Sequence, residues 1–339
     1  MHNRAAIRLV LACALAKAQH PESDARQPYT QIGGTASFSG RTLDESFIGP
    51  FITQHQLPCN ATTAFLTPAL RNRNQILTPD LNLVGRPPAV YKNALGLLTA
   101  LQDGLVSATN LLAEAFRLLI LMRDEAKQRR ATQLASLAAT TGTLPLAAEP
   151  IITLIEQHLR LPHTSRLPVL LVTAAYEAAG ALWGEQVKPL NAHNAADSQT
   201  GAVGDVEIIT AANDAQVTTG FEMKMKSVTR EDIDAALPKL VGRGVKHYVF
   251  ITTSPVEAEI KAYAETCYEL LSGIEIVVLD CVSFVRYFLH LFHSRRADFL
   301  EHYQRLLLAE PSSAVRQVLK EAWLAMRLAA ESRLAEPEE

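Results

Sequence analysis

The sequence predicts an α/β (α+β) fold in which helices flank a mixed central sheet, with a largely helical N-terminal region and a helical C-terminus. Two observations support this prediction. Strand-like and helical runs alternate in a β-β-α-β-α-β order from about residue 204 to residue 280. Apolar residues recur at helical spacing on either side of that stretch, over 91–140 and 284–333.

The composition is that of an ordinary globular protein. Of the 339 residues, 48% are apolar and 20% are charged. This length allows two packed subdomains or one large domain, and the sequence has no apolar run of about 18 residues that could span a bilayer. The four cysteines lie far apart without metal-ligand spacing, which suits a reducing cytoplasm. We therefore expect a cytoplasmic protein without a membrane segment.

Residues 1–40 are expected to form a flexible N-terminal arm. Arg4 and Arg8 precede a short apolar stretch, and the polar segment 20–40 that follows has no apolar periodicity. An export signal is the less favoured interpretation, because the apolar stretch is short and Arg8 abuts it.

Residues 41–160 are expected to form a loop-rich and helical region, a possible DNA-recognition subdomain. Arginine pairs bidentately with guanine, asparagine pairs with adenine, and both bind phosphate oxygens. The candidate DNA contacts in this region are Arg71, Asn72, Arg73, Asn74 and Arg86. Because Arg and Asn are also common in solvated turns, that alternative stays open.

Residues 161–283 are expected to form the catalytic core, and residues 284–333 two C-terminal helices that serve packing or self-association. The core begins with an apolar helix from about residue 167 to residue 183. A polar loop, 191–204, then leads into a hairpin of two short strands.

The second strand of this hairpin carries charged residues on one face. Side chains alternate along a strand, so Glu222, Lys224 and Lys226 share a face opposite Phe221 and the methionines. Three charges would be costly in an apolar core, and this face must meet water, a metal or an anion. With Asp205 at the start of the first strand, two carboxylates suit Mg²⁺, and Lys224 can hold an attacking water or developing phosphate charge. The pattern predicts phosphodiester hydrolysis.

The spacing of these residues resembles a known nuclease motif. Asp205, followed after a hairpin by Glu222-Met223-Lys224, is similar to the PD-(D/E)XK motif, with Gly204 in place of the family's proline. The longer runs 194–208 and 221–233 resemble the SacI-type family of type II restriction endonucleases. The similarity extends to Asn72-Arg-Asn, to the run 78–87 and to Val278-Leu-Asp-Cys, and so covers about residues 40 to 330.

This resemblance implies a PD-(D/E)XK endonuclease-like fold and a Mg²⁺-dependent enzyme that cuts double-stranded DNA at a short palindrome. Asp205, Glu222 and Lys224 would be catalytic, with Asp205 and Glu222 as the metal ligands. Many nucleases of this class place a further carboxylate on the preceding helix, which makes Glu177 a candidate metal or water partner; an exposed helix face is the equal alternative.

Further DNA contacts are expected around the hairpin. The polar loop before Asp205 contributes Asn194, Asp197, Gln199 and Thr200, and the segment after the hairpin contributes Lys226 and Arg230. Arg230 follows Thr229, which opens a capping box completed by Asp232 and so marks the start of a helix. The net charge of −3 does not exclude DNA binding, since a site-specific nuclease needs only a local basic cleft.

Cutting both strands of a palindrome predicts a homodimer, and restriction predicts a cognate DNA methyltransferase encoded nearby. Three alternatives stay open. The chain could be a catalytically silent or regulatory DNA-binding protein on a nuclease core, a nuclease of the repair or transposon type, or a structural helical protein with a chance motif. Retention of all three motif residues argues against the silent core.

Overall fold

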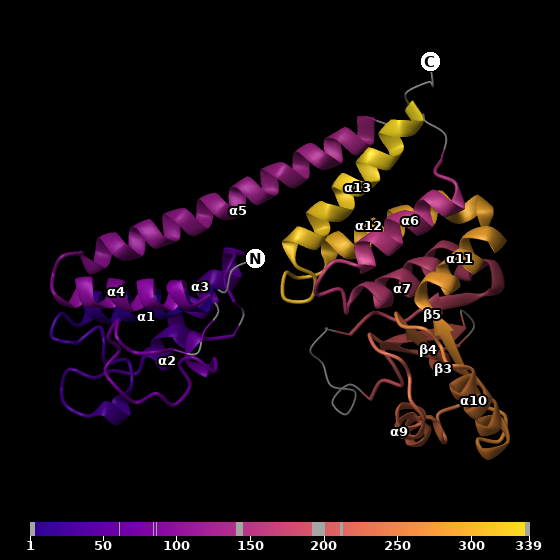
Figure 1. Cartoon of the computed structure of the whole chain (residues 1–339), viewed down its shortest axis with the longest axis horizontal. Helices are drawn as coiled ribbons and strands as arrows, with labels where there is room; N and C mark the ends of the chain where they lie inside the picture. Colours follow the sequence, from indigo (N-terminus) through magenta and orange to yellow (C-terminus); the bar gives the residue numbers. More distant parts are fainter. Residues whose placement is uncertain are drawn as a thin grey trace. The chain divides into compact units, whose positions relative to one another are not determined.

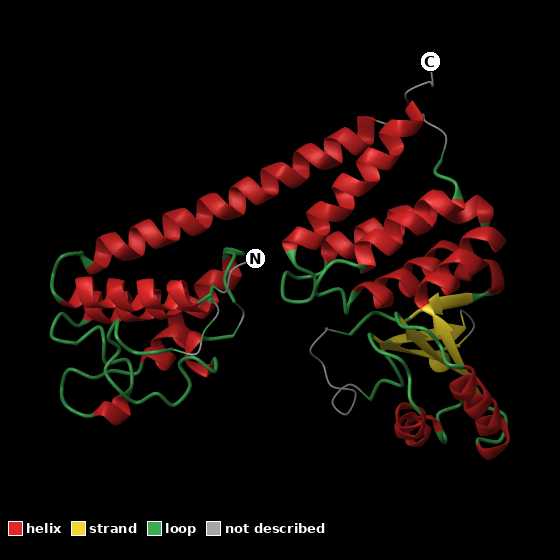
Figure 2. Cartoon of the chain, viewed as in Figure 1, coloured by secondary structure: helices red, strands yellow, loops and turns green. Residues whose placement is uncertain are grey.

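The computed structural model describes residues 4–60, 62–83, 85, 87–139, 145–191, 201–210 and 213–335. The chain divides into two compact units, residues 1–131 and residues 132–339. Figure 1 labels most of the helices and some of the strands along the chain, and Figure 2 shows that the strands belong to the second unit. None of the helices formed by the described residues combines the length and apolarity that a membrane span requires.

The described part of the first unit is built from helices and loops. Its helices are α1 (Ala5–Gln19), α2 (Gly40–Leu43), α3 (Gly49–Gln54), α4 (Pro88–Gln102) and α5 (Ala108–Ala139), the last of which crosses the division between the units. Buried side chains of α1 and α4, among them Leu9 and Leu95, share one core with Phe65 and Leu77 from the segment between these helices. This is the helical, loop-rich N-terminal region that the sequence predicts.

The expectation of a flexible arm over residues 1–40 is wrong for α1. Leu9 and Leu11 are fully buried, because this helix is apolar on nearly all sides and is therefore most stable inside a core. Arg8, which abuts the apolar stretch, is also buried and holds Asp44 through two hydrogen bonds of 3.0 and 2.8 Å. A fully paired charge can enter the interior, and this pair ties α1 to the following segment.

The second unit contains a five-stranded sheet in the order β1-β2-β3-β4-β5. The strands are β1 (Glu185–Val187), β2 (Val206–Thr210), β3 (Asn213–Lys224), β4 (His247–Thr252) and β5 (Glu275–Asp280). The first three strands pair antiparallel and the last three pair parallel, which makes the sheet mixed as predicted. Strand β1 was not predicted, since three residues are too short to show a period of two.

Helices cover both faces of this sheet (Figure 1). They are α6 (Ala148–Leu159), α7 (Leu167–Ala179), α9 (Arg230–Leu240), α10 (Ala258–Leu270), α11 (Cys281–Leu291), α12 (Arg296–Ala309) and α13 (Gln317–Ala335). Val206 and Phe221 pack with α6, α7 and the C-terminal helices in one core. Tyr248 and Phe250 face the other way and pack with α9 and α10.

The domain boundaries differ from the expected ones. Helix α6 was expected to belong to the N-terminal region, but its Ile151 and Ile155 are buried in the same core as α7. The C-terminal segment 284–333 contributes Tyr303 and Trp323 to that core as well, and forms most of three helices rather than two. A catalytic core limited to 161–283 would leave the apolar face of α7 without a cover, so the larger unit is the folding unit.

Candidate active site

The register of β2 and β3 brings the two predicted carboxylates together. Val206 pairs with Phe221 in the antiparallel ladder, so the next residues outward, Asp205 and Glu222, are neighbours. Since Val206 and Phe221 point into the α7 side of the sheet, alternation turns Asp205 and Glu222 toward the α9 side. The backbone N–H of Met223 donates to Oδ2 of Asp205 at 2.8 Å, which fixes the aspartate across the two strands.

The structure explains why Gly204 stands where the PD-(D/E)XK motif has a proline. A Cβ atom built at this position would lie 2.5 Å from the carbonyl oxygen of Phe221. Backbone cannot yield to such a contact as a flexible side chain can. Proline and every other residue with a Cβ are therefore excluded from this close approach of the two strands.

Glu222 is held by three side chains. Its Oε1 lies 3.3 Å from Nζ of Lys224, and its Oε2 accepts from the hydroxyl of Tyr248 at 3.1 Å and lies 3.9 Å from Nζ of Lys239. Tyr248 comes from β4 and Lys239 from α9, so the carboxylate is fixed by elements far apart in the sequence. Its side chain is only 17% exposed, and this pairing offsets the cost of partial desolvation.

Lys224 has a second carboxylate partner in Asp232, on the first turn of α9. The distance between Nζ and Oδ1 is 3.4 Å. Partial burial alone would lower the pKa of Lys224, but the charges of Glu222 and Asp232 outweigh it and raise that pKa above its ordinary value. Burial acts to raise the pKa of Asp232, yet hydrogen bonding from Thr229 and the charge of Lys224 leave it lowered. The site therefore contains a lysine in its ammonium form between two carboxylates.

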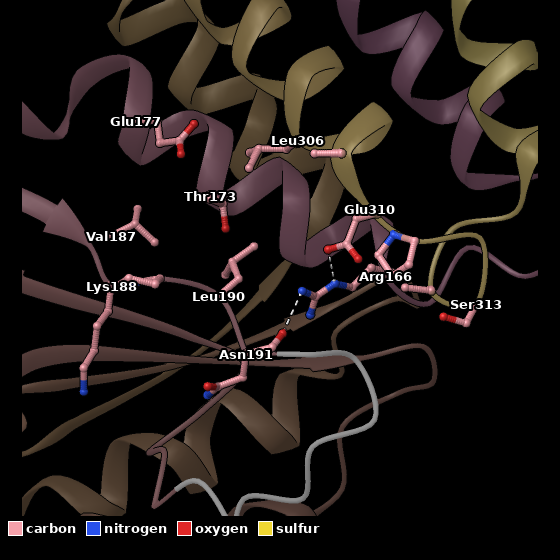
Figure 3. A pocket seen from close by; sticks show the side chains of 14 residues that line it. Arg166, Thr173, Glu177, Val187, Lys188, Leu190, Asn191, Leu306, Glu310 and Ser313 are labelled. Carbon is pink, nitrogen blue, oxygen red and sulfur yellow. Dashed lines mark hydrogen bonds and ion pairs between the residues drawn. The ribbon is translucent and has the colours of Figure 1, made fainter. Parts of the chain in front are cut away.

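Glu177 lies elsewhere. On α7 its Oε2 pairs with Nδ1 of His302 at 3.0 Å and with Arg305, both from α12. Figure 3 shows it in the lining of a cavity of about 670 Å³ between α7, α12 and the chain after β1, beside the Arg166–Glu310 ion pair. Because α7 covers the opposite face of the sheet, the structure does not bring Glu177 to Asp205 and Glu222.

The other DNA-contact candidates of this unit lie near the site or outside the described residues. The side chain of Lys226 is 69% exposed, and its Nζ lies 3.5 Å from Oδ2 of Asp232, the carboxylate that also pairs with Lys224. Arg230 is half-exposed, pairs with Glu259 and stacks over the ring of Tyr263 with 5.1 Å to its centroid. Asn194, Asp197, Gln199 and Thr200 lie outside the described residues.

The candidates of the first unit form a turn. Asn72 and Asn74 have φ angles of 54° and 47°, the left-handed region that asparagine tolerates better than most residues. Arg73 folds back onto the carbonyl oxygen of Ala69 at 2.9 Å, and Arg71 is exposed. These contacts give the two asparagines a conformational role, as the solvated-turn alternative predicts, while Arg86 lies outside the described residues.

Three residues of the site were missed as functional candidates from sequence. Asp232 was predicted only as a helix cap, and the structure confirms the capping box with Thr229. Tyr248 and Lys239 carry no local signal, because their approach to Glu222 depends on the pairing of β3 with β4 and on the packing of α9.

The donors present fit a Mg²⁺ ion bound largely by substrate and water. Asp205 and Glu222 supply hard carboxylate oxygens from adjacent strands, and within the described ranges no group of three or more His, Cys, Asp or Glu side chains could hold a metal. Mg²⁺ commonly uses one or two carboxylates and completes its shell with waters and phosphate oxygens. Two carboxylates beside an ammonium group are thus a chemically sufficient protein contribution.

The part of the chain that contains this site matches a known protein family. Residues 146–253 match the family model described as the SacI restriction endonuclease C-terminal domain. The match runs from just before α6 to just after β4 and includes Asp205, Glu222, Lys224 and Tyr248. No curated protein matches the chain.

Proposed function

We propose that this chain, whose residues 146–253 match the SacI restriction endonuclease family, is a Mg²⁺-dependent type II enzyme that cuts double-stranded DNA at a short palindrome. The family match supports a nuclease that acts on DNA. The observation that supports catalysis by this chain is the convergence of Asp205, Glu222 and Lys224 on one face of the sheet.

Asp205 and Glu222 are the residues that would hold Mg²⁺, which when bound supplies Lewis-acid stabilisation of the scissile phosphate and lowers the pKa of a coordinated water. Asp205 is exposed and is oriented by the N–H of Met223, so its carboxylate can meet a phosphate that approaches from solvent. Glu222 is oriented by a hydrogen bond from the hydroxyl of Tyr248, and this bond leaves its carboxylate able to bind the ion as well.

Lys224 would orient the attacking water and neutralise charge that develops on the phosphate. Its raised pKa keeps it as an ammonium at neutral pH, so it donates hydrogen bonds from a fixed position. A proton can leave the water through Lys224 only after the lysine has lost its own. Lys226, which is more exposed and lies next to Asp232, would contact the backbone of the DNA strand that is cut.

Two active sites are needed to cut both strands of a palindrome, and a two-fold symmetric homodimer supplies them. The symmetry of such a dimer would match that of its site. A methyltransferase that modifies the same sequence would be its functional partner, and its gene would lie near that of the nuclease.

The direct test is incubation of the purified chain with unmethylated phage DNA and Mg²⁺. Lys224→Ala removes the catalytic ammonium, and an EDTA control removes the metal. Lys261→Ala, an exposed lysine on α10, is the matched control for loss of one lysine. We expect discrete bands with wild type and Lys261→Ala, and intact DNA with Lys224→Ala or EDTA.

The pattern of products decides between the alternatives. Discrete bands whose ends map to one sequence would give the recognition site. A smear abolished by the same controls would keep the active site and reject restriction specificity. DNA left intact across several substrates and metals would favour a DNA-binding protein on a silent nuclease core.

A further inference from the structure

Glu207 is a carboxylate of the catalytic sheet that the proposed reaction does not use. It lies two residues after Asp205 on β2, so alternation places both side chains on the same face. Only 8% of its surface is exposed, and in the register it stands opposite Gly220 rather than opposite a basic residue of β3. A buried carboxylate is costly unless it is paired, so its partners indicate its role.

Both carboxylate oxygens of Glu207 contact segments that border the active site. Oε1 accepts from the backbone N–H of Val203 at 2.7 Å, and Oε2 lies 3.1 Å from Nζ of Lys188. The backbone carbonyl of Glu207 also accepts from the N–H of Lys188 at 2.9 Å. One residue thus joins the turn before β2 to the chain that follows β1.

The bond to Val203 closes a short loop around the metal-binding aspartate. This loop contains Gly204 and Asp205, and glycine gives the backbone more conformational freedom than any other residue. Gly204 is nevertheless required, because a Cβ there would meet the carbonyl oxygen of Phe221. The conformational freedom of this glycine must therefore be limited by other contacts. Glu207 holds the start of the loop at Val203, and Lys188 holds Glu207 at its end.

We propose that Glu207, anchored by Lys188, is a positioning residue that fixes the Gly204–Asp205 turn so that Asp205 can bind the metal. This inference rests on the proposed function. Lys188 comes from the chain after β1 and lines the cavity of Figure 3, where its side chain extends away from Glu177. Lys188 pairs with Glu207, on the face of the sheet that carries Asp205, whereas Glu177 pairs with Arg305 of α12.

The test is a titration of the full chain with Mn²⁺ in the absence of DNA, followed by calorimetry. Glu207→Met removes both carboxylate contacts at similar length, and Glu207→Gln keeps an acceptor for the N–H of Val203. Asp205→Asn removes the ligand itself. Glu275→Gln is the matched control, since Glu275 is a half-exposed carboxylate on β5 paired with His247.

We expect Glu207→Met to weaken Mn²⁺ binding by about tenfold, as is typical when a residue that orients a ligand is lost. Glu207→Gln and Lys188→Met should weaken it less, because each retains part of the linkage. Asp205→Asn should abolish the site, and Glu275→Gln should bind as wild type does. If Glu207→Met does not fold, the result with Lys188→Met decides, since Lys188 is half-exposed.

Two outcomes would overturn the role of Glu207. Wild-type affinity in Glu207→Met and Lys188→Met would show that the turn is fixed without them. Loss of binding in Glu207→Met as complete as in Asp205→Asn would make Glu207 a ligand. Failure of the proposed function gives a different result, in which wild type itself shows no Mn²⁺ site that Asp205→Asn removes, and the role of Glu207 is overturned with it.

Discussion

The ammonium nitrogen of Lys224 lies 3.4 Å from Oδ1 of Asp232, while Oδ2 of the same aspartate accepts from the N–H of Thr229 at 3.2 Å. One carboxylate thus caps the first turn of α9 and orients the lysine that we propose to be catalytic. The side chain of Asp232 therefore sets both the start of α9 and the position of Lys224. Different substitutions at Asp232 should change stability and activity to different extents.

Replacing Asp232 by Asn should reduce cleavage more than stability. The Asn oxygen can still accept from Thr229, but Lys224 loses one of its two charged partners, and we expect the cleavage rate to fall by about tenfold. Asp232→Ala should in addition cost about 1 kcal/mol of stability through loss of the cap. Cleavage assays with thermal melts check this, with Asp234→Asn on the same helix as control; an unchanged rate in Asp232→Asn would contradict it.

Tyr248→Phe should weaken metal binding without disturbing the fold. The ring is fully buried and Phe fills the same space, but Glu222 loses the hydroxyl donor at 3.1 Å. We expect roughly tenfold more Mg²⁺ to be needed for half-maximal cleavage. Tyr29→Phe, which removes a buried hydroxyl from the first unit, is the control and should leave the metal dependence unchanged.

Gly204→Ala should impair both the fold and the site. The added Cβ would lie 2.5 Å from the carbonyl oxygen of Phe221, and separating the strands there should cost about 1–3 kcal/mol. The Asp205–Met223 hydrogen bond would be displaced, and cleavage should fall. Gly96→Ala is the matched control, because nothing lies within 4 Å of its Cβ position in α4. Equal melting temperatures for the two variants would refute the prediction.

Arg8→Met tests the finding that α1 belongs to a core. Arg8 and Asp44 are paired and almost completely buried, so removing the arginine leaves an unpaired carboxylate in the interior. Such a change costs about 3–5 kcal/mol. Urea unfolding should show the loss, whereas Arg41→Met, which breaks an exposed pair with Glu45, should change stability by less than about 1 kcal/mol.

The second unit should lose stability in mild acid through His158. This histidine is fully buried; Nε2 lies 3.0 Å from the carbonyl oxygen of Leu319 and must donate to it, so Nδ1 accepts from the hydroxyl of Tyr303 at 2.9 Å. Burial lowers the pKa of His158 from 6.5 to about 4, and the bond to Leu319 opposes this only in part.

The sign follows from which state binds the proton. Above pH 6.5 the imidazole is neutral in both states, but between pH 6.5 and about 4 only the unfolded chain is protonated, so stability falls as the pH falls. The difference between the two pKa values corresponds to about 3 kcal/mol. Urea unfolding measured across this pH range should show the unfolding free energy falling as the pH falls. This pH dependence should be weaker in His158→Phe and unchanged in His20→Gln, because His20 is exposed.

Local periodicity was enough to place the proposed catalytic residues on one face of the sheet. The alternation that puts Glu222 and Lys224 on one face of a strand is a property of any strand, and the capping box of Thr229 and Asp232 closes within one turn. The order of strands and helices from 204 to 280 was predicted for the same reason, since each element shows its own period.

The tertiary structure decided the contacts that join distant segments. Tyr248 reaches Glu222 only because β4 pairs parallel with β3 in one register, and a shift by one residue would turn its ring to the other face. The surroundings of Glu177 depend on the packing of α7 against α12. The burial of α1 depends on the core that surrounds this helix. Periodicity gives the face on which a side chain lies, whereas what that face meets depends on long-range pairing that no local pattern records.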